Sequence, residues 1–410
     1  MKYGLIGERL GHSFSKTVHE MLGYYEYELC EIKPNNLDLF MKEKKFSGIN
    51  VTIPYKQDVI PYLDEIDDMA REIGAVNTVV NRGGKLYGYN TDYYGMKMLF
   101  TKAEIDPRGK KAAILGSGGT SKTAYAVLKS LGASEIIKVS RSSNGGAVSY
   151  DVLKEHHRDT EIIVNTTPLG MFPNISGCAI DVSNFERLIG VIDAVYNPIN
   201  STLVQSAREK KINAEGGLYM LICQAVKASE LFLDKKLDLG VAEEIFDVIK
   251  KEKENLILVG MPACGKSTVG RILAERLSRK FVDTDDLITE KIGMEIKDYF
   301  KLYGEDEFRK VEEEVIRSLA TENSLVIATG GGAVTRKSNI TSLRYNGKIF
   351  FIDRPLDKLM PTESRPLSSD RASIEKRYNE RYDIYCGCCD VHINADCEIM
   401  AVADKILESF

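Results

Sequence analysis

The chain carries Gly260-Met261-Pro262-Ala263-Cys264-Gly265-Lys266-Ser267-Thr268, and this stretch decides the fold of the C-terminal half. It matches the pattern G-x-x-x-x-G-K-[ST] in full, after the apolar run Leu256-Ile257-Leu258-Val259 and before apolar residues at helical spacing. In a strand–glycine turn–helix of this kind, backbone N–H groups point at phosphate oxygens and the lysine reaches the β- and γ-phosphates. The sequence therefore predicts a nucleoside triphosphate site. Its binding residues are Gly260, Ala263, Cys264, Gly265, Lys266, Ser267 and Thr268.

Composition indicates a globular chain of more than one domain. With 410 residues and about 150 residues per domain, two or three domains are expected. The net charge of -5 is not concentrated in a long block, which argues against a nucleic-acid or membrane partner. No apolar run reaches the roughly 18 residues of a membrane span, and Met1-Lys2 leads into a predicted strand rather than a signal peptide. We therefore expect a cytoplasmic protein.

The cysteines are spread along the chain, which is typical of reduced thiols rather than a disulfide framework. Cys386, Cys388 and Cys389 cluster, with His392 and Cys397 nearby. We interpret this cluster as a helix end followed by a strand rather than as a metal site.

A second predicted strand brings carboxylates to the nucleotide site. The run Lys280-Phe281-Val282 leads into Asp283, Asp285 and Asp286. Asp283 is expected to hold Mg²⁺ through water beside Ser267, and Asp285 stands where an acceptor hydroxyl needs a base or an orienting partner. Asp286 fits the cap of the following helix.

Polar residues also follow the predicted strands near the N-terminus. Gly11–Lys16 contains two hydroxyls that suit either an anion or a helix N-cap. Gly48–Lys56 ends in Asn, Thr and Lys, with a proline just before the lysine. Gly74–Thr78 and Gly88–Asp92 show the same pattern.

Together these stretches resemble shikimate dehydrogenase, over residues 1 to about 240. The resemblance implies that Ser13 and Ser15 hold the substrate carboxylate, and that Lys56 and Asp92 form the catalytic pair. A lysine beside a carboxylate can deliver a proton to a developing alkoxide. The alternative interpretation is an ordinary ion pair on the protein surface, which would consist of the same two residue types. The implied substrate pocket consists of Ser13, Ser15, Asn50, Thr52, Lys56, Asn77, Asp92, Tyr196 and Gln224. The chain departs from the family at Lys16 and Glu20, where Pro and Asn are usual.

A dinucleotide site is predicted next. Ala112–Leu115 runs into the glycine turn Gly116–Lys122 and a small-residue helix. Ser121 replaces the third glycine of the general fingerprint, but the form G-x-G-G-x-x-x-A is the one that shikimate dehydrogenases carry. Arg141 between two serines suits a ribose 2′-phosphate, which favours NADP(H) over NAD(H). The resemblance adds Asn165 and Thr166. The expected cofactor residues are Gly116, Ser117, Gly118, Gly119, Thr120, Ser140, Arg141, Ser142, Asn165 and Thr166.

Residues 255 to 410 resemble shikimate kinase, through the phosphate loop, Gly304–Arg309 and Ala328–Val334. The resemblance implies that ATP and Mg²⁺ bind here, with Ser267 and Asp283 on the metal and Lys266, Asp285 and Arg365 in catalysis. Arg365 is also expected to contact ATP from a lid. The implied substrate residues are Asp285, Arg309, Gly330, Gly331, Gly332 and Arg381. Lys358–Thr362 is short for this family and lacks the arginine that often stacks on adenine.

The expected fold class is α/β throughout. We expect a substrate domain over 1–101 with returning helices at about 218–249, and a Rossmann domain over 102–217. The charged run 250–255 is interpreted as a solvated linker. A P-loop domain of the nucleoside-monophosphate-kinase type, with a central parallel sheet, is expected over 256–410.

Both resemblances concern one small molecule. They imply a bifunctional enzyme that reduces 3-dehydroshikimate to shikimate with NADPH and then phosphorylates the shikimate 3-hydroxyl with Mg·ATP. Two alternatives stay open. One half acts only as a binding or regulatory module, or the first half is a quinate-type dehydrogenase that uses NAD.

Overall fold

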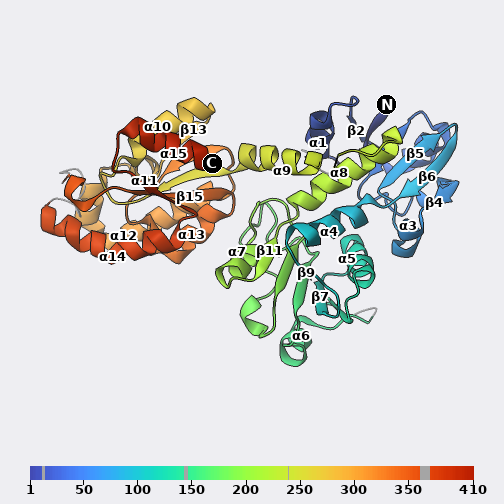
Figure 1. Ribbon diagram of the computed structural model, residues 1–410, viewed down its shortest axis with the longest axis horizontal. Helices are drawn as coiled ribbons and strands as arrows, with labels where there is room; N and C mark the ends of the chain where they lie inside the picture. The colour runs from blue at the N-terminus through green and yellow to red at the C-terminus, as the bar shows by residue number, and fades with distance from the viewer. Residues whose placement is uncertain (12–13, 143–145, 239, 361–369) are drawn as a thin grey trace. The chain divides into compact units, whose positions relative to one another are not determined.

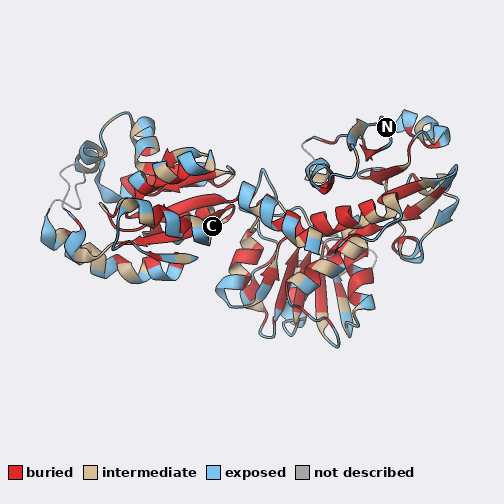
Figure 2. Cartoon of the chain, turned by 45° about the horizontal axis from the view of Figure 1, so that its top comes forward, coloured by how far each residue is buried: buried red, intermediate tan, exposed pale blue. Residues whose placement is uncertain are grey.

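The computed structural model describes residues 1–11, 14–142, 146–238, 240–360 and 370–410. These residues form two compact units, Met1–Ile249 and Lys250–Phe410, each with its own hydrophobic core (Figure 1). In both units the strands are largely buried and the outward faces of the helices are exposed (Figure 2). No helix in the described ranges is long and apolar enough to cross a membrane. The predicted α/β fold class is confirmed.

The first sheet of unit 1 is mixed, with six strands in the order β2-β1-β3-β5-β6-β4. β1 runs parallel to β2 and β3, so the carboxyl ends of β1 and β3 lie at the same edge. That edge receives the polar segments that follow each strand. The elements are β1 (Tyr3–Gly7), α1 (Phe14–Leu22), β2 (Glu28–Glu31), η1 (Pro34–Asn36), α2 (Leu37–Glu43), β3 (Gly48–Val51), η2 (Ile60–Tyr62), β4 (Glu65–Ile66), α3 (Asp68–Ile73), β5 (Thr78–Arg82) and β6 (Lys85–Tyr89).

The second sheet of unit 1 is fully parallel, in the order β11-β10-β9-β7-β8. Helices on both faces explain why its central strands are continuous apolar runs rather than alternating ones. β7 pairs with both β8 and β9, and this reversal of strand order is where such sheets bind ligands. The elements are β7 (Lys111–Leu115), α5 (Gly119–Ser130), β8 (Glu135–Val139), α6 (Tyr150–His156), β9 (Ile162–Asn165), η3 (Val182–Asn184), β10 (Gly190–Asp193), α7 (Thr202–Glu209) and β11 (Asn213–Glu215).

Three long helices pack together in unit 1: α4 (Thr91–Lys102), α8 (Leu218–Leu233) and α9 (Gly240–Lys253). Their apolar faces share one core cluster with β7 and β9. α4 and α8 cross closely at Gly95, where a Cβ would collide with the carbonyl oxygen of Met220. The glycine therefore allows α8 to lie against the helix that carries Asp92.

Residues 250–255 differ from the predicted solvated linker. α9 continues to Lys253 and β12 begins at Asn255, and both Glu254 and Asn255 are buried. The Asn255 side chain donates to the Glu322 carbonyl and accepts from the Leu325 N–H. The charges that suggest a linker belong to the last turn of a helix, where lysines interact favourably with the negative end of the helix dipole.

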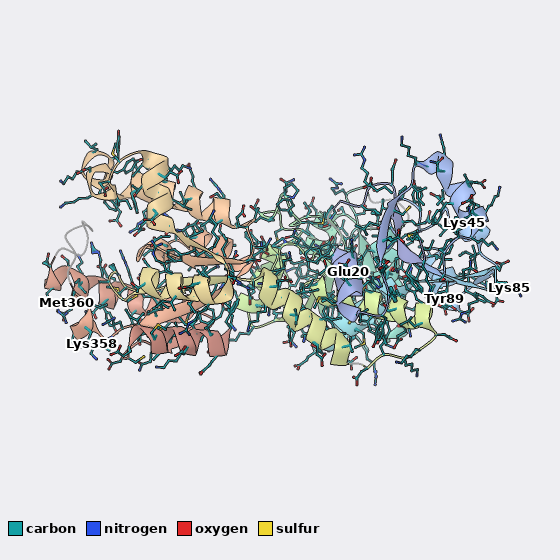
Figure 3. All side chains as sticks on the ribbon, turned by 90° about the horizontal axis from the view of Figure 1, so that it is seen from above. Glu20, Lys45, Lys85, Tyr89, Lys358 and Met360 are labelled. Atoms are coloured by element: carbon teal, nitrogen blue, oxygen red, sulfur yellow. The ribbon has the colours of Figure 1, made fainter. Side chains whose placement is uncertain are left out.

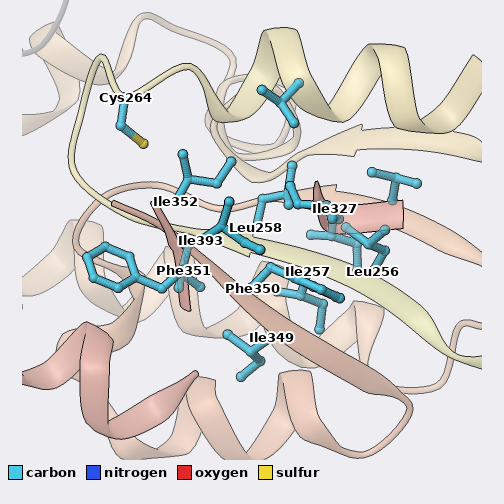
Figure 4. Packing of buried hydrophobic residues seen from close by; sticks show 14 of the residues in the cluster. Leu256, Ile257, Leu258, Cys264, Ile327, Ile349, Phe350, Phe351, Ile352 and Ile393 are labelled. Atoms are coloured by element: carbon cyan, nitrogen blue, oxygen red, sulfur yellow. The ribbon is translucent and has the colours of Figure 1, made fainter. Parts of the chain in front are cut away.

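Unit 2 has one parallel sheet in the order β13-β14-β12-β15-β16. Leu256, Ile257 and Leu258 of the central strand pack among side chains of β14 and β15 (Figure 4). The elements are β12 (Asn255–Val259), α10 (Lys266–Leu277), β13 (Lys280–Asp283), α11 (Thr284–Ile292), α12 (Ile296–Leu319), β14 (Leu325–Ala328), η4 (Ala333–Thr335), α13 (Lys337–Arg344), β15 (Gly347–Asp353), η5 (Leu356–Lys358), α14 (Arg371–Cys388), β16 (Val391–Asn394) and α15 (Ile399–Ser409).

α12 is interrupted at Gly304, whose φ of 81° and ψ of 177° are non-helical. A residue with a Cβ rarely adopts that conformation, so glycine is required at this break. The second segment of α12 begins there and carries Glu305, Arg309 and Glu312 on one face.

Candidate active sites

Unit 1 contains a cavity of about 330 Å³ at the edge where β1 and β3 end. All predicted substrate residues in the described ranges line it: Ser15, Asn50, Thr52, Lys56, Asn77, Asp92, Tyr196 and Gln224. Ser13 lies outside the described residues. The cavity is also lined by Arg9, Phe14 and Thr120, among others. Segments far apart in the sequence, from Leu5 to Gln224, therefore meet at one site.

The central feature of the cavity is an ion pair between Lys56 and Asp92. Lys56 Nζ donates to Asp92 Oδ2 at 2.6 Å, and the two side chains keep 30% and 21% exposure. Asp92 lies in the first turn of α4, where the helix dipole favours a carboxylate, and Asn90 caps that helix by accepting from the Tyr93 N–H. The pair is open to the cavity and is arranged for transfer of a proton.

Buried hydrogen bonds fix the carboxamides beside this pair. Asn50 Oδ1 accepts from the Tyr27 hydroxyl at 2.7 Å, and Asn50 Nδ2 donates to Thr78 Oγ1 at 3.0 Å. Asn77 Oδ1 accepts from the Thr91 N–H at 2.7 Å, so its Nδ2 is left as the donor for a ligand. Thr78 Oγ1 lies 3.1 Å from Thr91 Oγ1, which joins the two halves of the network.

Gln224 extends the same network from α8. Its Oε1 accepts from Thr91 Oγ1 at 3.4 Å and its Nε2 donates to the Leu221 carbonyl at 2.9 Å. Tyr196 packs edge-on against Phe14, with ring centroids 5.5 Å apart, and burial raises the pKa of its hydroxyl. The hydroxyl therefore stays protonated and is a donor to the cavity.

Lys16 and Glu20, the two departures from the family pattern, lie outside the cavity lining. They form an ion pair at 3.6 Å on the exposed side of α1, and Figure 3 labels Glu20. Their side chains are about half exposed, so the departure leaves the site intact.

The glycine turn after β7 provides an open cradle at the N-terminus of α5. Gly116 has a φ of 113°, and a Cβ there would lie 2.7 Å from Thr166 Oγ1. A Cβ at Gly118 or Gly119 would have no neighbour within 4 Å, so space remains in front of the helix N-terminus. Because Thr120 lines the substrate cavity, this cradle adjoins it. The arrangement fits a dinucleotide pyrophosphate.

Arg141 follows β8 on an exposed turn. Ser140 Oγ lies 3.2 Å from Ser142 Oγ and accepts from the Ser142 N–H, which holds the turn. The guanidinium of Arg141 forms no ion pair with the described carboxylates. An arginine without a carboxylate partner, beside two hydroxyls, suits a phosphate.

Asn165 does not face the cofactor cradle. Its side chain is 1% exposed, donates to Asp193 Oδ1 at 2.8 Å and accepts from the N–H and hydroxyl of Thr167. The Thr166 hydroxyl likewise donates to the Leu115 carbonyl, at 2.7 Å. The Asn165 side chain therefore joins β9 to β10, and the Thr166 side chain joins the end of β9 to β7.

In unit 2 the phosphate loop runs from β12 to α10 as predicted, and Gly260 and Gly265 take φ values of 146° and 98°. Lys266 is buried, and its Nζ donates to the carbonyls of Gly260 and Met261 at 2.9 Å each. Cys264 lies in the loop that follows the central strand β12, and its side chain is buried in the core (Figure 4). Its backbone, rather than its thiol, is therefore placed for phosphate. A Cβ at Gly265 would meet nothing within 4 Å, so the loop is open in front of α10.

A hydroxyl and a carboxylate meet beside the loop. Ser267 Oγ donates to Asp283 Oδ2 at 2.6 Å, and Asp283 Oδ1 accepts from the Asp285 N–H as the N-cap of α11. Mg²⁺ prefers oxygen ligands of this kind and is usually held by one or two carboxylates plus phosphates. Within the described ranges no cluster of three His, Cys, Asp or Glu side chains completes a cage. The pair therefore fits an ion shared with a bound nucleotide.

Glycines bring acidic and basic groups together beyond the loop. A Cβ at Gly330 would lie 2.7 Å from Asp285 Oδ1 and 3.1 Å from Glu312 Oε1, and a Cβ at Gly332 would collide with the Arg309 guanidinium. Gly331 accepts hydrogen bonds from Arg381 Nη1 at 3.1 Å and from the Tyr385 hydroxyl at 2.5 Å. Asp285, Arg309 and Arg381 therefore all lie next to the predicted triple glycine.

Arg309 is held by two carboxylates of its own helix. It donates to Glu312 Oε2 at 2.7 Å and to Glu305 Oε1 at 3.0 Å. Burial raises the pKa of Glu312 and the charge of Arg309 opposes that rise. The Glu312 side chain is 1% exposed and the Glu305 side chain is 50% exposed. The buried Glu312 carboxylate therefore holds Arg309 in place, whereas a ligand could replace the Glu305 carboxylate.

Several site residues were absent from the sequence prediction: Arg9, Thr78, Thr91, Glu305, Glu312 and Tyr385. Glu312 stands three residues after Arg309, a helical spacing that signals an ion pair. Glu305 stands four residues before Arg309, which is a helical spacing too, whereas the other four residues carry no such signal. Arg365 lies outside the described residues, and Figure 3 labels the exposed Met360 that precedes that range. In the cysteine cluster, Cys386 and Cys388 lie in the last turn of α14 and β16 begins at Val391.

Comparison with known proteins gives a family match in each unit. The family model of the shikimate dehydrogenase substrate binding domain matches residues 5–79, and that of shikimate kinase matches residues 262–410. The NADP(+) shikimate dehydrogenase of Clostridium beijerinckii is 37% identical over 265 residues, covering 61% of this chain and 98% of its own length. That of Halothermothrix orenii is 40% identical over 276 residues, covering 59% and 92%.

Solved structures show the same fold in unit 1. A chorismate mutase/shikimate 5-dehydrogenase fusion protein from Clostridium acetobutylicum superposes with a TM-score of 0.57 at 34% identity, covering 61% of this chain and 97% of that one. Shikimate 5-dehydrogenase from Thermus thermophilus, solved with NADP(H) and shikimate, gives 0.54 at 27% identity and covers 60% and 99%. The chain therefore belongs to the shikimate dehydrogenase family over its first unit and carries a shikimate kinase domain in its second.

Proposed function

We propose that the chain catalyses two consecutive reactions. Unit 1 reduces 3-dehydroshikimate to shikimate with NADPH, and unit 2 transfers the γ-phosphoryl group of ATP to the 3-hydroxyl of shikimate. The observation that carries the first reaction is the Lys56–Asp92 pair at 2.6 Å inside a cavity lined by the other predicted substrate residues. The second rests on Asp285, Arg309 and Arg381 around the triple glycine beside a phosphate loop.

In the first reaction NADPH supplies the hydride to the substrate ketone. Lys56 donates the proton to the developing alkoxide, and Asp92 keeps the ammonium group oriented. Both side chains retain partial exposure, so solvent can return the proton to Lys56. Asn77 Nδ2 and the Tyr196 hydroxyl are donors for the substrate oxygens.

The cofactor preference is supported by the residues that would hold it. The open cradle at Gly118 and Gly119 fits the pyrophosphate, and Arg141 fits the 2′-phosphate. The names of the relatives, which specify NADP(+), point the same way. A quinate-type enzyme that uses NAD would be expected to carry a carboxylate in place of Arg141.

In the second reaction Lys266 would exchange its carbonyl partners for the phosphates of ATP. Ser267 and Asp283 would hold Mg²⁺, which would supply charge that neutralises the phosphates. Asp285 orients the acceptor hydroxyl. Arg309 and Arg381 bind the substrate carboxylate. The substrate carboxylate replaces Glu305 as the hydrogen-bond acceptor on the exposed side of Arg309. Closure of Arg365 over the site and a cytoplasmic location both remain predictions.

The test is a coupled assay on the full chain. NADPH oxidation is followed with 3-dehydroshikimate, and ADP release is followed when Mg·ATP is added, for the unmutated chain, Lys56→Ala and Lys266→Ala. We expect each substitution to abolish one activity and to leave the other unchanged. If the unmutated chain lacks either activity, that unit is a binding or regulatory module and the proposal fails for it.

A further inference from the structure

Arg9 is a charged residue of the dehydrogenase cavity to which no role is yet assigned. It lies on the loop after β1 and lines the cavity. Lys56 and Asp92 are the other charged residues of the described lining, and they neutralise each other at 2.6 Å. Arg9 forms no ion pair with the described carboxylates. The net positive charge of the cavity lining therefore comes from Arg9.

The backbone on both sides of Arg9 is fixed. The Glu8 N–H donates to the Ile53 carbonyl at 3.4 Å, and the Leu10 N–H donates to Glu31 Oε1 at 2.9 Å. The Gly7 carbonyl, just before this segment, accepts from the Ile32 N–H at 2.8 Å. The Glu31 carboxylate thus binds the loop backbone rather than the guanidinium. The backbone at Arg9 is therefore held in place, while its exposed side chain is ordered only when a ligand binds.

A carboxylate that leaves water for a cavity needs hydrogen bonds and a compensating charge. The hydroxyls of Ser13 and Ser15, which the family resemblance implies for the substrate carboxylate, offer hydrogen bonds but no charge, and Arg9 would add the charge. A guanidinium offers both, because its planar fork matches the two oxygens of a carboxylate.

We propose that Arg9 is a specificity-determining residue that pairs with the carboxylate of the dehydrogenase substrate. The proposal rests on the proposed reduction of 3-dehydroshikimate by unit 1. It predicts that Arg9 separates acidic substrates from neutral ones of the same shape, while Lys56 and Asp92 carry out the proton transfer. The alternative ligand for Arg9 is a phosphate of the nucleotide, because Thr120 of the cofactor cradle lines the same cavity.

The first experiment measures the steady-state kinetics of Arg9→Gln and Arg9→Lys in the full chain. For Arg9→Gln we expect the KM for 3-dehydroshikimate to rise about tenfold or more, because a hydrogen bond to a charged group is lost. The KM for NADPH and kcat should change less than about twofold. Arg9→Lys keeps the charge without the fork and should fall in between. Arg187→Gln removes an exposed arginine outside the cavity lining and is the matched control.

The second experiment repeats the comparison with the carboxamide of 3-dehydroshikimate. The proposal requires that Arg9→Gln and the unmutated chain use this neutral analogue equally well. A rise in the KM for NADPH, or an equal loss with acid and amide, would overturn it. An unchanged KM for NADPH in the same samples shows that unit 1 of the variant is folded.

A binding measurement separates this proposal from the proposed function. The unmutated chain and Arg9→Gln are titrated with 3-dehydroshikimate in a calorimeter. Unit 2 is identical in both, so the difference between the titrations belongs to the cavity of unit 1. Weaker binding to the variant supports the role of Arg9 even if the unmutated chain shows no turnover. Equal binding overturns it.

Discussion

At the scale of single residues, Asp193 is a buried carboxylate in unit 1 that the proposed reactions do not use. It accepts from Asn165 Nδ2, the Ser201 hydroxyl and the Val195 N–H. Burial nevertheless raises the pKa of Asp193 from 3.8 to about 6. The folded protein therefore binds this proton more tightly than the unfolded chain does. The stabilisation is complete below about pH 3.8 and is lost as the pH rises through about 6.

Asp193→Asn should remove this pH dependence. We expect the difference in unfolding free energy between the unmutated chain and the variant to change by up to about 3 kcal/mol between pH 4 and pH 7. The unmutated chain gains relative to the variant at the acidic end. Urea unfolding of unit 1 at both pH values measures this difference in unfolding free energy. Parallel stability curves would show that folding does not shift the pKa of Asp193.

Residues of the sites differ in how far the sequence reveals them. Lys266 and Ser267 lie inside one continuous motif, so their roles could be predicted locally. Lys56 and Asp92 are 36 residues apart, and their pairing followed from family resemblance rather than from spacing. The inward orientation of Asn165 could not be predicted, because it depends on Asp193, which belongs to another strand.

At the scale of elements, the second segment of α12 carries a buried ion pair between Arg309 and Glu312, beside the proposed kinase site. Arg309→Ala would leave Glu312 buried without its counter-charge. We expect a loss of about 3–5 kcal/mol in the unfolding free energy of unit 2, together with loss of kinase activity. Glu305→Ala is the control. Its half-exposed carboxylate should contribute less than about 1 kcal/mol, which urea unfolding of both variants would show.

The N-terminus of α5 gives a second prediction at this scale. A Cβ at Gly119 would meet no protein atom within 4 Å, so Gly119→Ala should leave stability nearly unchanged. The added methyl group occupies space proposed for the pyrophosphate. We expect the KM for NADPH to rise about tenfold or more, while the kinase activity stays constant. An unchanged KM for NADPH would mean that the cofactor does not approach this turn.

Element patterns were also informative to different degrees. The strands of the parallel sheets are short apolar runs followed by glycine turns, and these were recognisable in the sequence. Residues 250–255 resemble a solvated linker because all of them except Asn255 are Lys or Glu, whereas the helix continues to Lys253. Charge alone does not distinguish a linker from the exposed end of a helix.

At the scale of the whole molecule, two separate cores lie on one chain. We predict that ligands protect the units selectively in hydrogen-exchange measurements on the full chain. NADPH should slow exchange in peptides from residues 111–142, and Mg·ATP should slow exchange in peptides from 255–283. Lys266→Ala should lose only the second effect. A ligand stabilises the state that binds it by about 2.7 kcal/mol at a hundred times its Kd.

The cavity of unit 1 also belongs to this scale, because its parts come from the whole of the first 224 residues. No local pattern brings Gln224 to Asn77. The folding of α8 against α4, through the close approach at Gly95, does so. Arg9 was missed for the same reason, since only the folded chain shows that it lines the cavity.

The network that joins Asn50, Asn77 and Gln224 through Thr78 and Thr91 also limits how this enzyme can be redesigned. Each carboxamide takes its orientation from a shared hydroxyl, so altering one reorients its neighbours. Single substitutions at these positions would mostly lower the activity, and the effects of two substitutions would not be additive. A library of variants designed for a new substrate should therefore vary these positions together, because a new arrangement of donors and acceptors requires the hydrogen-bond partners to change at the same time.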